Sequence, residues 1–94
     1  MQDIELVQLP VAPAQAAELV RVLEQARSGY LRPPNCQGVE VLMKLEGDEV
    51  AVVIRWASAA AHAAATSGPH MAPFLQAVAA LACAAPKLTR YLPT

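Results

Sequence analysis

Apolar and polar residues alternate in the middle of the chain in a pattern that predicts a β-hairpin. Val39–Leu45 and Val50–Trp56 flank the segment 46–49, whose central Gly47-Asp48 pair is typical of a two-residue turn. That turn would place Glu40 opposite Arg55, a favourable cross-strand pair, on a mixed face of the hairpin. The other face would be wholly apolar and would consist of Val39, Val41, Met43, Leu45, Val50, Val52, Ile54 and Trp56. Something must therefore cover this second face.

Short strands are predicted near both ends, at Ile4–Leu9 before Pro10 and at Leu88–Leu92 after Pro86. Helical spacing predicts a helix from Pro13 until the Pro33-Pro34 pair, one over Ser58–Thr66 with Ser58 as N-cap, and one from Pro69 or Pro73 to about Ala82. The order β-α-β-β-α-β predicts an α+β, ferredoxin-like fold, in which helices cover one face of a four-stranded antiparallel sheet. We expect one domain over residues 1–94.

Composition excludes several classes of function. The chain is 55% hydrophobic and 16% charged, with a formal net charge of −1, so a nucleic-acid or membrane partner is not expected. The apolar content is high for a small monomer and favours self-association. The N-terminal segment 1–9 has neither a basic region nor a long apolar run, which predicts a cytoplasmic protein.

Few residues offer chemistry. Cys36, Cys83, His62 and His70 lack the spacing of a zinc site, and no phosphate-binding loop or Ser-His-Asp set is present. His62 lies in an alanine-rich helix, where imidazole could transfer protons near neutral pH or could simply be half-exposed. Trp56 could line a pocket or complete the core. All eight acidic residues lie at or before Glu49.

One stretch resembles a known family. The run RWASAAAHAAATSGPHMAPF at 55–74 is similar to the antibiotic biosynthesis monooxygenase-like domains of the dimeric α/β-barrel superfamily. Family members commonly have a strand-ending tryptophan, a Ser-led helix, a Pro-His step and a later phenylalanine, here Trp56, Ser58, Pro69-His70 and Phe74. The segment PNCQGVEVL at 34–42 resembles the family's entry to the second strand, with Asn35 where glycine is usual.

The chain also departs from the family pattern. Many members carry a histidine where this chain has Ala65, and quinol-oxidising members carry an asparagine where it has Val52. His62 stands where some quinol monooxygenases have a cavity-lining tyrosine. The strand IELVQL lacks the asparagine of haem-degrading relatives, which disfavours haem degradation.

The resemblance implies a cofactor-independent monooxygenase that oxidises an electron-rich polycyclic phenol or quinol with O2. His62 would be the catalytic proton shuttle, and the substrate would contact Trp56, His70, Val52, Phe74 and Tyr30. No cofactor or metal is expected. A non-catalytic small-molecule-binding or interaction dimer of the same fold is the alternative, and it is favoured by Val52 and Ala65. The resemblance also implies a homodimer, packed through the mixed hairpin face that contains Leu42, Ala51 and Val53.

Overall fold

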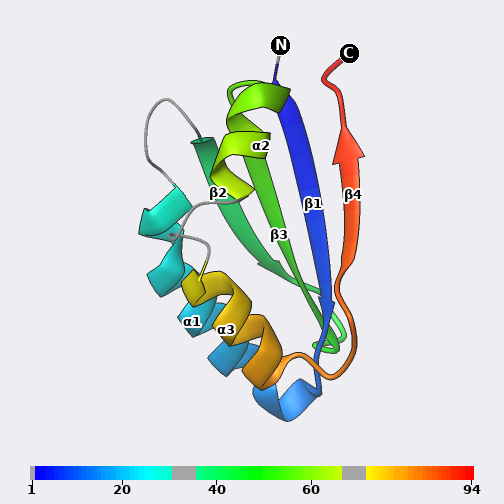
Figure 1. Ribbon diagram of the computed structural model, residues 1–94. Coiled ribbons are helices and arrows are strands. Elements are labelled where there is room, and N and C mark those ends of the chain that lie inside the picture. Colours follow the sequence, from blue (N-terminus) through cyan, green and yellow to red (C-terminus); the bar gives the residue numbers. More distant parts are fainter. Residues whose placement is uncertain (1, 31–35, 67–71) are drawn as a thin grey trace.

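The computed structural model describes residues 2–30, 36–66 and 72–94. Within these residues, four strands form one antiparallel sheet in the order β2-β3-β1-β4 (Figure 1). The elements are β1 (Asp3–Pro10), α1 (Pro13–Tyr30), β2 (Cys36–Met43), β3 (Glu49–Trp56), α2 (Ala59–Thr66), α3 (Ala72–Leu81) and β4 (Lys87–Tyr91). The predicted ferredoxin-like α+β fold is confirmed, and each predicted strand and helix is present with shifted ends.

The helices lie on one face of the sheet, with α1 and α3 side by side and α2 near the end of β3 (Figure 1). The apolar stripe of α1 faces the sheet: Leu19 is 0% exposed and Leu23 is 2% exposed. Both pack in the same core as Val7, Val50 and the other inward residues of the strands. Removal of these apolar side chains from water is the dominant favourable contribution to folding.

The hairpin register differs from the prediction by two residues. Met43 pairs with Val50, and the loop spans four residues, closed by hydrogen bonds from Gly47 N to Lys44 O at 2.8 Å and from Lys44 N to Glu49 O at 2.9 Å. Gly47 has a φ of 78°, so it takes a left-handed position as the third residue of a four-residue loop and is not the first residue of a two-residue turn. A shift of two residues leaves every side chain on its predicted face.

The predicted pairing of Glu40 with Arg55 is wrong as a directly opposed pair. Arg55 lies opposite Gly38, and Glu40 lies opposite Val53. The two charges still meet diagonally, with Arg55 Nη2 3.8 Å from Glu40 Oε1. This contact is solvent-exposed, so it contributes little to stability.

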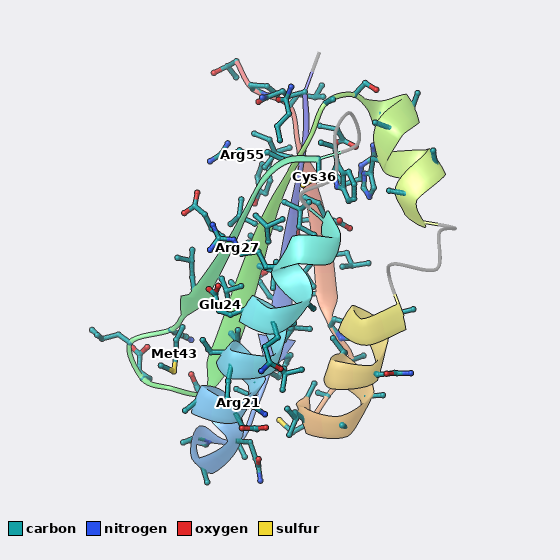
Figure 2. The ribbon with its side chains drawn as sticks, turned by 90° about the vertical axis from the view of Figure 1, so that its left-hand side faces the viewer. Arg21, Glu24, Arg27, Cys36, Met43 and Arg55 are labelled. Atoms are coloured by element: carbon teal, nitrogen blue, oxygen red, sulfur yellow. The ribbon has the colours of Figure 1, made fainter. Side chains whose placement is uncertain are left out.

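The apolar face of the hairpin is only partly covered. Val50, Val52, Ile54 and Trp56 are 0–1% exposed, whereas Met43 is 52% exposed. Cys36 and Met43 lie at opposite ends of β2, and Met43 is at the end near the hairpin loop (Figure 2). On β2, burial therefore decreases towards the hairpin loop, whereas the inward side chains of β3 are buried along the whole strand.

The other face of the sheet carries no helix (Figure 1). Across it, Leu6 lies opposite Val53 in the centre, and Ile4 lies beside Tyr91. Tyr91 is 51% exposed and Leu42 is 48% exposed. Among the described residues, none of the helices combines the length and apolarity that crossing a membrane requires.

Candidate functional site

The end of the sheet that contains Trp56 differs chemically from the rest of the helix-covered face. Side chains alternate along a strand, so Asp3 and Glu5 point to the same face as Val7 and Leu9. The register places Asp3 beside Trp56 and Glu5 beside both Ile54 and Arg90. Two carboxylates therefore face the helices at one end of an otherwise apolar face.

Helix α2 places an imidazole over these carboxylates. Ser58 caps the helix, because its Oγ accepts a hydrogen bond from Ala61 N at 3.0 Å, as predicted. One turn into the helix, His62 is 9% exposed and its ring stacks on the indole of Trp56. The ring centroids are 4.9 Å apart and the planes are 5° from parallel. The expectation of a half-exposed histidine is wrong, since the sheet and the indole enclose the ring.

Asp3 joins the imidazole to a guanidinium. Its Oδ2 is 2.7 Å from His62 Nδ1, and its side chain is 3% exposed. Arg90 reaches the same carboxylate from β4: Nε donates to Oδ1 at 3.3 Å, and Nη2 donates to Oδ2. The hydrogen bonds from Arg90 hold the pKa of Asp3 below its ordinary value, and those from His62 act in the same direction, while burial opposes the shift. Asp3 is therefore a buried carboxylate that stays ionised.

Glu5 approaches the other ring nitrogen. Its Oε1 is 3.4 Å from His62 Nε2 and accepts a hydrogen bond from Trp56 Nε1 at 3.5 Å. Both distances are at the long end for hydrogen bonds. Glu5 is 13% exposed at the side chain, so it is the second carboxylate enclosed at this end of the sheet.

These five residues come from four elements and form a continuous chain of contacts: Arg90, Asp3, His62, Glu5 and Trp56. A carboxylate flanks each ring nitrogen, so the ring can give or take a proton while the charge that forms remains paired. Two residues of β4 lie on the helix side of the sheet. Leu88 is 61% exposed, and the side chain of Arg90 is 58% exposed. The face of β4 beside this cluster is therefore open to solvent.

The structure places the predicted site residues unevenly. It brings His62 and Trp56 together. Val52 is 1% exposed within the core, one inward position along β3 from Ile54. His70 lies outside the described residues, as do the side chains of Tyr30 and Phe74, so their predicted contacts with substrate stay predictions.

Asp3 and Glu5 were not predicted as site residues, and the alternation along the last strand left open whether Arg90 or Tyr91 faces the helices. The alternation of Asp3, Glu5, Val7 and Leu9 could have revealed two acids on a buried face. Nothing local could have revealed Arg90, because its side of the sheet depends on β4 lying beside β1. Within the described parts of the chain, no three His, Cys, Asp or Glu side chains are grouped to hold a metal ion.

Comparisons with known proteins identify the fold. The family profile described as antibiotic biosynthesis monooxygenase matches residues 4–77. Among curated proteins, none matches the chain. The solved structure of Rv0793 from Mycobacterium tuberculosis is similar with a TM-score of 0.85 and 16% identity, over 100% of this chain and 96% of that one.

Two further solved structures show the same fold. A conserved protein from Methanosarcina mazei has a TM-score of 0.84 at 12% identity, with 97% of this chain and 91% of that chain covered. A variant of SnoaB from Streptomyces nogalater, described as a cofactor-independent oxygenase, has a TM-score of 0.81 at 18% identity, with 98% and 92% covered.

Proposed function

Because the chain belongs to the antibiotic biosynthesis monooxygenase family, we propose that it is a cofactor-independent monooxygenase that oxidises an electron-rich polycyclic phenol or quinol with O2. The observation that carries the proposal is the buried His62, stacked on Trp56 and flanked by Asp3 and Glu5. It combines a group that exchanges protons with two enclosed carboxylates that can stabilise its charged form.

The reaction begins with a proton transfer. A phenolic O–H bond of the substrate breaks, and its proton passes to the imidazole of His62, which leaves an electron-rich phenolate. The anion then transfers electrons to O2 at its activated ring carbon. For an anthrone, the bond that breaks is one C–H bond of the ring CH2, which leaves the corresponding phenolate. The CH2 becomes C=O with one oxygen atom of O2, and the other oxygen atom leaves as water with the two hydrogens, one of which the imidazolium of His62 returns. The substrate supplies all four electrons, so the step needs no other reductant.

The remaining residues support this chemistry without taking part in bond changes. Trp56 is 1% exposed, so its indole keeps water from one face of the imidazole. The substrate would approach along the open side of β4, where Leu88 provides an apolar contact. His70, Phe74 and Tyr30 are proposed to complete the contacts with substrate, and Val52 to lie beneath them.

Non-catalytic binding of a small aromatic molecule is the second candidate function. It is supported by Val52 and Ala65, which stand where the resemblance expects polar groups; each is 1% exposed. Oxygen consumption by the wild-type protein with an anthrone and with several polycyclic quinols separates the candidates. Uptake of one O2 per product supports the oxygenase, whereas tight binding without uptake contradicts it and supports the binding protein.

We also propose that the functional unit is a cytoplasmic homodimer packed through the uncovered face of the sheet. The central Leu6 and Val53 give this face an apolar middle, and Glu40 and Arg55 lie beside it. Leu6 and Val53 join β1 to β3, and Glu40 and Arg55 join β2 to β3. The face is therefore a continuous surface over these three strands.

A further inference from the structure

We infer that Asp3 is a positioning residue, which fixes the imidazole of His62 with its proton on Nδ1 and leaves Nε2 as the nitrogen that exchanges a proton with substrate. The role given to Nε2 rests on the proposed function. The presence of the proton on Nδ1 is independent of that function, because it follows from the contacts of Asp3 alone.

The distances decide which nitrogen carries the proton. Asp3 Oδ2 is 2.7 Å from Nδ1, whereas Glu5 Oε1 is 3.4 Å from Nε2. An ionised carboxylate only accepts hydrogen bonds, so a contact of 2.7 Å requires a hydrogen on Nδ1. At 3.4 Å the gain from a hydrogen on Nε2 is much smaller. The neutral ring is therefore held as the Nδ1–H tautomer.

Arg90 makes this assignment stable. Its guanidinium donates to both oxygens of Asp3, and these hydrogen bonds are the largest cause of the lowered pKa of the carboxyl. A protonated Asp3 could donate to Nδ1 and reverse the tautomer, but Arg90 opposes that state. Arg90 thus acts on His62 through Asp3, although its own side chain is 58% exposed.

Glu5 completes the arrangement after proton transfer. Once Nε2 has taken a proton, the imidazolium has a hydrogen on each nitrogen, and Glu5 Oε1, 3.4 Å from Nε2, can accept the second. The imidazolium is then paired at both ends, as the product of proton abstraction requires in a buried site. The two carboxylates have different roles: Asp3 sets the tautomer, and Glu5 meets the charge that appears.

Long-range ¹H–¹⁵N NMR of the imidazole tests the inference directly, because a protonated ring nitrogen and a bare one give separate signals. Spectra are recorded above about pH 8.5, where imidazole is ordinarily neutral. A His62→Gln spectrum identifies the signals of His62 against those of His70. We expect the Nδ1–H tautomer in the wild-type protein and a shift towards Nε2–H in Asp3→Ala. Asp3→Leu, which keeps the branching at Cγ without the carboxylate oxygens, provides the same test if Asp3→Ala does not fold.

Asp3→Asn serves as the conservative variant. Its amide oxygen is expected at the Oδ2 position, because His62 Nδ1 and Arg90 Nη2 both donate there, so the Nδ1–H tautomer is retained. Glu18→Gln is the matched control: it removes a carboxylate that also binds an arginine, Arg21, but on the exposed side of α1. This control leaves the His62 signals unchanged.

Two results would overturn the inference: an Nε2–H tautomer in the wild-type protein, or an unchanged tautomer in both Asp3→Ala and Asp3→Leu. Neither depends on oxygen consumption. A wild-type protein with the Nδ1–H tautomer and no oxygen uptake would contradict the proposed function and leave the positioning of His62 by Asp3 intact.

Discussion

The imidazole of His62 lies parallel to the indole of Trp56, with ring centroids 4.9 Å apart, and both rings are withdrawn from solvent. Trp56 is the only tryptophan of the chain, so tryptophan fluorescence reports on the surroundings of this one indole. His62→Ala uncovers one face of the indole, and we expect the emission maximum to move to longer wavelength. Ala63→Gln, at an exposed position of the same helix, should leave it in place. An unshifted maximum in His62→Ala would contradict the stacked arrangement.

The same substitution tests the proposed activity. Loss of a general acid-base group typically lowers the rate roughly 10²–10⁴-fold, and we expect that loss of oxygen consumption in His62→Ala. The substitution also removes a buried partner of Asp3, which costs about 1–3 kcal/mol of folding free energy. His62→Gln retains a polar side chain there, so a folded His62→Gln protein with wild-type oxygen uptake would exclude His62 as the proton shuttle.

Stability should depend on pH through Asp3. Its pKa is lowered in the folded protein, so the unfolded chain binds more protons in acid. The stabilisation is present above the ordinary carboxyl pKa, 3.8, and is lost as pH falls through the lower folded value. We therefore expect urea unfolding to show a large deficit for Asp3→Asn at neutral pH that shrinks as the pH falls below 3.8.

The exposed Glu18 provides the comparison, because Arg21 lowers its pKa in the same direction. Its side chain is 45% exposed and the pair is screened by water, so Glu18→Gln should change stability little at any pH. Equal deficits in Asp3→Asn and Glu18→Gln would show that burial of the Asp3 carboxylate has no energetic consequence.

The hairpin loop can be tested at Gly47, with Gly38 of β2 as a control. Gly47 has a φ of 78°, so Gly47→Ala should destabilise the protein by about 1–2 kcal/mol although no atom lies within 4 Å of the added carbon. Gly38→Ala is the matched control, since it meets only Arg55 Cδ at 3.9 Å, an ordinary contact. Thermal unfolding of both variants measures the difference, and equal melting temperatures would count against the four-residue loop.

The proposed dimer can be tested at the centre of the uncovered face. Val53→Lys places a charge opposite Leu6, and we expect light scattering at micromolar concentration to shift from dimer to monomer. Arg55→Glu should weaken assembly less, because it replaces the exposed ion pair with Glu40 by a like-charge contact. Arg21→Gln, on the helix side, is the control. A wild-type monomer under these conditions would contradict the dimer.

Local patterns in the sequence determined the elements and the faces of this fold. The three- and four-residue spacing in α1 placed Leu19 and Leu23 in the core, and Ser58 was identified as the cap of α2. Alternation assigned Val50, Val52, Ile54 and Trp56 to one face correctly even though the predicted register was displaced. These features need only neighbours along the chain, since side-chain direction repeats every two residues in a strand and about every 3.6 in a helix.

The loop geometry and the site required the tertiary structure. The sequence Gly47-Asp48 permits more than one turn, and the φ of Gly47 selects between them only in the folded hairpin. Asp3, His62 and Arg90 are far apart in the sequence and meet because β1 lies between β3 and β4 and α2 lies across its end. Contacts of that kind depend on strand order and on the placement of a helix over the sheet, which single-residue preferences do not encode.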